Sequence, residues 1–421
     1  MMRARAHPTA AMAAAAMAFA LVAPGVPVAE ASAATATTDH HLHAGAPGAS
    51  VALADLASLD RAGIVDLLER TPGLVATLLT QTSAAEVSVW WAGMDAAHRA
   101  VLTRTVPLLV GSLDGVDAAD RVRANRYAAR ARLARVDERL QSLVRSDQDG
   151  DAAQRDDLLL ERRYLTKVVA DQVHLYLYAP ERGAMIEMAG DPSTAAGILL
   201  VVPGTNASVR SFMVDDPVTS FADWQVANAD PSSPIVAFTV LAAPMPQLSL
   251  NLATGPQNNT IATAAGAGYA RIVKGIDVAF PGLPTLSYEH SAGSQVGSAA
   301  EAHGARFDVR FLAGGVGATD GYHPVAGTTY YAAQAAEDVN RYYAGFQVGD
   351  IGYGVGPEDI PGVVIVDPGY SEKQATGSVG AMLMQGLDLH NRLFSGDGRT
   401  NGTVLKDVRL LLASLARGSS G

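Results

Sequence analysis

The sequence contains no cysteine among its 421 residues. This absence excludes disulfide bonds, thiolate metal sites and catalysis by a cysteine nucleophile. Aromatic residues are also scarce, at 6% of the chain, whereas apolar residues as a whole make up 48%. The hydrophobic core must therefore hold the fold without covalent cross-links, and the apolar content suffices for a core of that kind.

Positive charge is in deficit, since 31 lysines and arginines face 42 aspartates and glutamates, giving a net charge of −11. Nucleic acids and anionic membrane surfaces are themselves negatively charged, so an acidic chain is a poor candidate for binding either of them. We therefore expect no nucleic-acid partner.

The N-terminus has the pattern of a secretory signal peptide. Arg3 and Arg5 give a positive start, residues 10–20 form a short apolar core, and small residues follow two prolines at 31–34. This pattern predicts cleavage after Ala33 and export, with 1–33 as the signal peptide. A retained membrane anchor is the alternative, but the apolar core is too short to span a bilayer.

Removal of residues 1–33 takes away a net charge of +1, so the mature chain would carry −12. No run of 18 or more apolar residues follows, so we expect no transmembrane segment in the mature protein. The expected location is therefore outside the cell or in the cell envelope.

The mature chain divides into three regions. Residues 34–50 are small and polar and predict a flexible N-terminus. Its histidines, His40, His41 and His43, could bind a divalent metal ion, but a solvated tail is the simpler interpretation. Residues 51–171 repeat apolar positions every three to four residues, which indicates a helical region.

Within that region, Gly63 separates two apolar groups, and a later pair of segments predicts a helical hairpin. The strongest helix signals lie at 53–59, 64–68, 120–145 and 154–169.

From residue 172 to residue 421 the pattern changes to short apolar strands that alternate with helices. Such alternation implies a mainly parallel sheet, and an opening hairpin before parallel strands is the order of an α/β-hydrolase domain. The predicted strands lie at 173–178, 184–188, 198–202, 235–240, 283–288, 307–312, 328–333 and 362–366.

Residues 288–294, YEHSAGS, are the most informative stretch because they place Ser291 between a strand and a helix. A serine at such a turn can act as a nucleophile, as in the pattern G-x-S-x-G. Gly293 fills the second glycine position, but Glu289 stands at the first. A carboxylate there would repel an oxyanion intermediate unless it pointed away into solvent. The alternative is a serine in an ordinary turn.

A serine nucleophile needs a base and an acid that orients the base, in the chain order Ser, acid, His. Asp338 follows the strand at 328–333, where the acid is expected, and Asp367 is the reserve. His390 lies beyond the last strand, where the base is expected.

The other histidines are weaker candidates for the base. His303 ends the helix after the serine, too far away at about 1.5 Å per residue. His323 comes early, between two strands. His290 should point away from Ser291 or line the pocket.

An acyl-transfer site also needs amide donors for the oxyanion. The first would be the amide of Ala292. The second would come from the loop 201–207, which leaves a buried strand, through Thr205 or Asn206, with Thr205 preferred.

These passages resemble an actinobacterial family of secreted α/β-hydrolases that was long described only as a domain of unknown function. The similarity spans roughly residues 85–415, and the helical lead-in is its most specific part. The passages that carry it are 90–94, 107–116 and 121–126 in the lead-in, 202–205 at the oxyanion loop, 289–294 at the elbow, 337–339 at the acid and 390–394 at the histidine.

The resemblance implies Ser291 as nucleophile, Asp338 as acid and His390 as base, and it names no substrate. Together with the residues above, it predicts a secreted serine hydrolase acting on a small-molecule or lipid ester, without metal or organic cofactor. The departure at Glu289 keeps one alternative open, a catalytically inactive binding or scaffold protein at the cell surface.

Overall fold

The computed structural model describes the larger part of the chain, and the predicted signal peptide and cleavage site lie outside the described residues. The described residues are 48–146, 152–248, 255, 257–318, 322–342, 347–349, 351–352, 354–370 and 379–418. Among them, no helix combines the length and apolarity needed to cross a bilayer.

The central element is an eight-stranded sheet with the order β1-β2-β4-β3-β5-β6-β7-β10. Strand β2 runs antiparallel to both β1 and β4, and the remaining pairs are parallel. This is the α/β-hydrolase order that the sequence predicts. The strands are β1 (His174–Ala179), β2 (Ala184–Ala189), β3 (Gly197–Val202), β4 (Ile235–Leu241), β5 (Thr285–His290), β6 (Val309–Ala313), β7 (Thr329–Ala333) and β10 (Val364–Val366).

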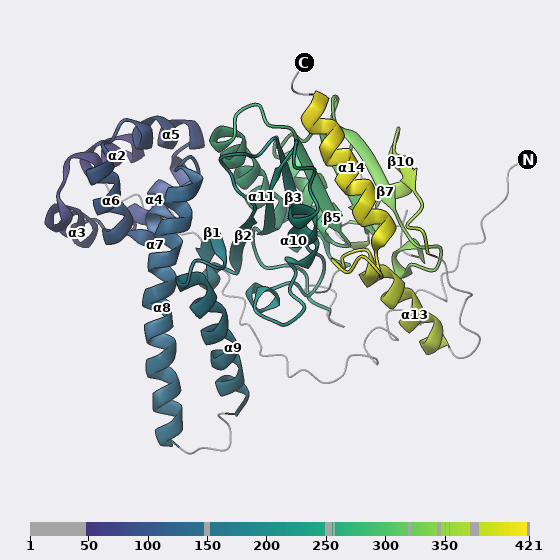
Figure 1. Ribbon diagram of the computed structural model, residues 1–421, viewed down its shortest axis with the longest axis horizontal. Helices are drawn as coiled ribbons and strands as arrows, with labels where there is room; N and C mark the ends of the chain where they lie inside the picture. The colour runs from purple at the N-terminus through teal and green to yellow at the C-terminus, as the bar shows by residue number, and fades with distance from the viewer. Residues whose placement is uncertain are drawn as a thin grey trace, which may run out of the picture.

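Helices cover both faces of this sheet, and side chains along each central strand alternate between the two cores. In β3, for example, Ile198 and Leu200 join the core beneath α11 and α12, whereas Leu199 and Val201 join the core beneath α10 and α14. Figure 1 shows α14 lying along the sheet over β3, β5 and β7. These helices are α10 (Ser220–Ala227), α11 (Asn259–Ala279), α12 (Gly293–Ala302), α13 (Val379–Arg392) and α14 (Gly402–Gly418).

Helices also fill the described residues before β1. They are α2 (Ala49–Ser58), α3 (Arg61–Arg70), α4 (Leu74–Gln81), α5 (Ala84–Ala92), α6 (Ala96–Thr105), α7 (Pro107–Val110), α8 (Ala118–Ser146) and α9 (Ala152–Val169). The antiparallel pair α8 and α9 projects away from the sheet, and the shorter helices gather beside one end of α8 (Figure 1).

One boundary in this region differs from the prediction. Gly63 lies inside α3 and does not separate the two apolar groups. The break falls at Asp60, whose carboxylate accepts a hydrogen bond from the Gly63 amide at 2.9 Å. An aspartate in this N-cap position starts the next helix, because its side chain accepts from an amide that has no partner within the helix. It therefore marks the boundary between the two helices more strongly than a glycine inside a helix does.

The remaining short elements lie mainly in the loops of the α/β part. They are the 3₁₀ helices η1 (Pro180–Arg182), η2 (Val209–Phe212), η3 (Val339–Tyr342) and η4 (Pro357–Asp359), and the strand pair β8 (Gln347–Val348) and β9 (Ile351–Gly352).

Candidate active site

Ser291 lies at a sharp turn between β5 and α12, as the sequence predicts. Its φ of 55° places it in the left-handed region, which a non-glycine residue adopts only under constraint. The Ser291 amide donates to the Ala313 carbonyl at 3.1 Å, and the Ser294 amide donates to the Ser291 carbonyl at 3.1 Å. The turn is therefore held from both sides in the conformation typical of a nucleophile elbow.

The loop after β3 approaches this turn closely because glycines leave room for it. A Cβ on Gly204 would lie 2.6 Å from the Cβ of Ser291. A Cβ on Gly293 would lie 2.6 Å from the carbonyl oxygen of Val202. Both contacts are far inside van der Waals distance, so larger residues would push the loop away from the serine.

The sequence predicts that Glu289 would repel an oxyanion unless its side chain pointed into solvent. The side chain does not point into solvent. It is fully buried on the α12 side of the sheet. It forms a paired hydrogen bond with Arg310 of β6, with distances of 2.9 and 2.5 Å. Successive strand residues point to opposite faces, so Glu289 and His290 face opposite sides of the sheet.

Space for this carboxylate comes from a glycine elsewhere in the chain. A Cβ on Gly297 of α12 would lie 2.1 Å from the Glu289 Oε1 atom. The small residue that the elbow pattern places at 289 is thus replaced by a small residue on the facing helix. The sequence does not predict this exchange, because Glu289 lies on the strand and Gly297 on the helix after the turn. Only the packing of the helix on the sheet brings the two positions together.

Arg310 is the centre of a buried charge cluster. Besides Glu289 it binds Glu301 of α12 at 2.6 Å, and it donates to the Ser294 carbonyl at 3.1 Å. Burial raises the pKa of Glu289, and the neighbouring Arg310 guanidinium opposes that rise. The cluster ties β5, β6 and α12 together directly beneath the turn that carries Ser291.

Asp338 and His390 are brought into contact, although 52 residues separate them. The Nδ1 atom of His390 lies 3.2 and 3.1 Å from the two carboxylate oxygens of Asp338. Asp338 is fully buried just after β7, and the amide of Asn340 also donates to it at 2.9 Å. A carboxylate accepts from Nδ1–H, which leaves Nε2 of His390 free to take a proton.

The loop 313–317 connects this pair to the serine. Its Ala313 carbonyl accepts from the Ser291 amide, and its Val316 amide donates to the Ser291 carbonyl at 3.2 Å. Between these two residues, a Cβ on Gly314 would lie 2.8 Å from His390 Nδ1 and 3.0 Å from Asp338 Oδ2. The serine and the Asp338–His390 pair therefore border the same short loop.

The Ser291 hydroxyl makes no hydrogen bond to the His390 ring among the described residues.

The amides expected to bind an oxyanion are those of Ala292 and Thr205, with Asn206 as the alternative to Thr205. Within the described part of the chain, the amides of Ala292 and Thr205 donate no hydrogen bond. The Asn206 amide, the alternative to Thr205, donates to the Pro246 carbonyl at 2.9 Å and is occupied. The geometry thus favours Thr205, and Asn206, at a φ of 67°, shapes the loop instead.

Of the other candidates that the structure describes, Asp367, His303 and His323 do not contact His390, whereas His290 does. Asp367 is exposed and accepts from the Gly369 amide, so it does not serve as the partner of His390. His303 is an exposed residue at the end of α12, and His323 is exposed in the loop before β7. His290, which the sequence left open, packs against His390 with ring centroids 4.6 Å apart.

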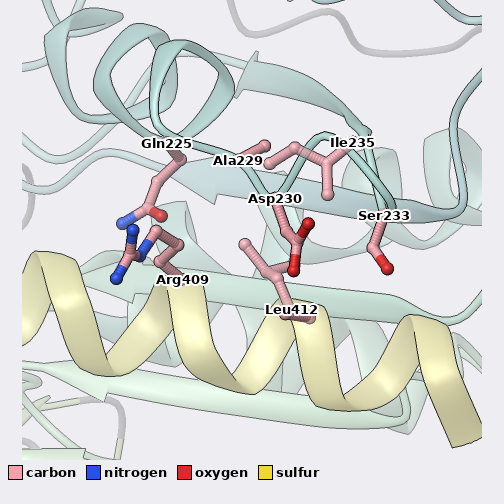
Figure 2. A pocket seen from close by; sticks show the side chains of 8 residues that line it. Gln225, Ala229, Asp230, Ser233, Ile235, Arg409 and Leu412 are labelled. Carbon is pink, nitrogen blue, oxygen red and sulfur yellow. The ribbon is translucent and has the colours of Figure 1, made fainter.

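A small pocket lies next to Ile235, the first residue of β4, between α10 and α14. Figure 2 shows Arg409 of α14 beside Gln225 of α10 in this pocket. The Gln225 amide donates to the Leu405 carbonyl at 2.9 Å, so its evident role is to join α10 to α14. In the part of the chain described here, no group of three or more histidines, aspartates or glutamates is arranged to hold a metal ion.

No protein-family model matches the sequence, and no curated protein matches it. Solved structures do match. A carboxylesterase from Mesorhizobium loti has 10% identity and a TM-score of 0.31, and the match covers 51% of this chain and 96% of that one. An α/β serine hydrolase without lid from Xanthomonas campestris has 13% identity and a TM-score of 0.30, and covers 56% and 88%. At these identities the likeness concerns the fold alone.

Proposed function

We propose that this protein is a serine hydrolase that cleaves an ester, with Ser291 as nucleophile, His390 as base and Asp338 as the acid that orients it. The observation that carries the proposal is the loop 313–317, which borders a serine in a left-handed turn and a buried Asp–His pair. The hydroxyl of Ser291, the imidazole of His390 and the carboxylate of Asp338 come from distant parts of the chain. The fold does not require them to lie at one loop, so their meeting there supports a catalytic role.

The proposed first half-reaction uses these three residues in turn. His390 Nε2 takes the hydroxyl proton of Ser291 while Oγ bonds to the ester carbonyl carbon. The carbonyl electron pair moves onto oxygen, and the amides of Ala292 and Thr205 stabilise the resulting oxyanion. The intermediate then breaks its bond to the alcohol oxygen, which receives the proton from His390, and an acyl-enzyme remains.

Water completes the cycle by the same route. His390 takes a proton from the water, the hydroxide attacks the acyl carbon, and the acid leaves as Ser291 Oγ regains its proton. Asp338 holds the imidazole with its proton on Nδ1. Glu289 does not oppose the oxyanion, because its charge lies on the α12 side against Arg310.

A fluorophosphonate probe tests the nucleophile. We expect it to label the wild-type protein and not Ser291→Ala. Asp338→Asn should lower kcat toward p-nitrophenyl esters on the order of 10³-fold or more, because the imidazole loses its preferred tautomer. Asp367→Asn is the matched control and should retain full activity.

Absence of labelling in folded wild-type protein would favour the alternative, a hydrolase-shaped binding or scaffold protein. A series of p-nitrophenyl esters of graded chain length would define the acyl preference. We also propose export by residues 1–33, and the mass of the protein recovered outside the producing cells should correspond to a chain that begins at Ala34. A recovered mass that retains these residues would argue against cleavage.

A further inference from the structure

Strand β5 sends side chains to both faces of the sheet near the candidate site. Ser287 and Glu289 point toward α12, where Glu289 meets Arg310. Tyr288 and His290 point the other way, toward the end of α13 that carries His390. The strand that presents the nucleophile therefore also contacts the segment that presents the base.

The contacts with the end of α13 and with the residue that follows it are hydrogen bonds to backbone carbonyls. The last carbonyls of a helix lack partners within the regular helix, and the His390 carbonyl also accepts from the Leu393 amide at 3.3 Å. His290 Nε2 lies 3.2 Å from the carbonyl oxygen of His390, and the Tyr288 hydroxyl donates to the carbonyl of Leu393. A carbonyl oxygen can only accept, so His290 must carry its proton on Nε2.

The His290 ring also fixes the side chain of the base. Its centroid lies 4.6 Å from that of His390 and 4.9 Å from that of Phe394, with the Phe394 ring stacked at 24°. Burial holds the pKa of His290 well below its ordinary value, so the ring is neutral. A neutral ring can rest against His390 without repelling the imidazolium that forms there during reaction.

We propose that His290 is a positioning residue, which donates its Nε2–H to the His390 carbonyl and packs on the His390 ring so that the base stays in register with Ser291. This inference rests on the proposed function of Ser291 and His390. His290 acts through His390, and its removal should therefore change kcat more than KM.

Paired substitutions separate the hydrogen bond from the packing. His290→Phe retains a ring of similar size but loses the donor, whereas His290→Gln retains a donor at similar reach. We expect His290→Phe to lower kcat about 10- to 100-fold with KM unchanged, as a small displacement of a catalytic group can do. His290→Gln should recover a large part of that loss, and the exposed His303→Phe should have no effect.

Urea unfolding of the same proteins shows whether a general loss of stability explains the result. The expected outcome is a loss of kcat in His290→Phe without a matching shift of the unfolding midpoint. An unchanged kcat in His290→Phe, or equal losses in the phenylalanine and glutamine variants, would overturn the inference.

A measurement that needs no substrate separates this inference from the proposed function. In the full chain labelled with ¹⁵N-histidine, the His290 resonances are those lost in His290→Phe, and they should show a neutral ring protonated at Nε2. A ring protonated at Nδ1, or at both nitrogens near neutral pH, would overturn the inference. Lack of fluorophosphonate labelling and of ester hydrolysis in the wild type would contradict the proposed function instead.

Discussion

At the scale of single residues, the candidate site depends on positions where side chains are absent. Gly204 lets the loop after β3 reach the Ser291 turn, Gly297 makes room for Glu289, and Gly314 lies against the Asp338–His390 pair. Only Gly314 among these three has a positive φ, of 56°, so it must satisfy a backbone requirement as well as a steric one.

Gly314→Ala should therefore displace the His390 side chain and lower activity more than it lowers the stability of the fold. Its Cβ would lie 2.8 Å from His390 Nδ1, which must shift. We expect kcat/KM to fall about 100-fold. Gly327→Ala is a matched control, because Gly327 also has a positive φ and a Cβ there meets nothing within 4 Å.

Both alanine variants should lose about 1–2 kcal/mol of unfolding free energy, the usual strain of a left-handed residue with a Cβ. Activity should distinguish them, since Gly327→Ala should hydrolyse esters like the wild type. Similar activity in the two variants would show that Gly314 does not position His390.

At the scale of secondary-structure elements, β5 organises the site through its two faces. The face with Glu289 is joined to β6 and α12 by a buried ion-pair cluster, and the face with His290 is joined to α13 by hydrogen bonds and ring packing. The turn at Ser291 is thus held by charges on one side and by the helix that carries His390 on the other.

Arg310→Met should be strongly destabilising, because it leaves Glu289 and Glu301 buried without their shared cation. We expect a loss of about 3–5 kcal/mol of unfolding free energy at pH 7, measured by urea unfolding. The loss should be smaller at pH 5, because without Arg310 the folded protein keeps protons on buried carboxylates that the unfolded chain releases as pH rises.

Two further variants control this result. Arg310→Met/Glu289→Gln should be more stable than Arg310→Met, since one of the two unpaired carboxylates is gone. Arg70→Met removes an exposed pair with Asp66 and should cost at most about 0.5 kcal/mol. Equal costs for Arg310→Met and Arg70→Met would contradict the buried-charge interpretation.

At the scale of the whole molecule, the helices α8 and α9 pack into the core of the α/β part, whereas α2 to α7 form a separate apolar cluster. Residues of α8, α9 and β1 belong to the same apolar cluster as α11 and α12. Arg121 of α8 donates to the Tyr176 carbonyl of β1 at 3.1 Å, and its guanidinium lies 4.0 Å from the Tyr176 ring centroid. Tyr164 of α9 donates to Glu187 of β2 at 2.8 Å.

The Tyr164–Glu187 contact predicts that stability depends on pH. Burial raises the pKa of Glu187 from its ordinary 4.5 to about 7, and the hydrogen bond from Tyr164 opposes the rise. Between these two values the folded protein holds a proton that the unfolded chain has released, so this carboxyl group lowers stability as pH rises through the window. The change should be about 3 kcal/mol.

Urea unfolding of the wild type and Glu187→Gln at pH 4.5 and pH 8 measures that change. The stability of the variant relative to the wild type should increase toward pH 8. Tyr164→Phe should extend the window to higher pH, because it removes the hydrogen bond that lowers the Glu187 pKa. Stability profiles that run parallel with pH in all three proteins would contradict the raised pKa of Glu187.

Much of the fold was predictable because its signals are local. Short apolar runs placed β3 and β4, and the strand–serine–helix pattern placed the turn at Ser291. The surroundings of Glu289 were not predictable in this way. In the sequence, its neighbour Arg310 is one residue of a predicted strand, and Gly297 is one residue of a predicted helix. Neither position therefore predicts a buried charge cluster.

The sequence by itself determined the strand and helix pattern and the choice of Ser291, Asp338 and His390 as candidates, because periodicity, turn chemistry and chain order are all contained in short segments. The tertiary structure alone decided which side chains meet. The contacts Glu289–Arg310, Asp338–His390 and His290–His390 join residues 21, 52 and 100 positions apart. Such contacts depend on how β5, β6, β7 and α13 pack against one another, which no local pattern specifies.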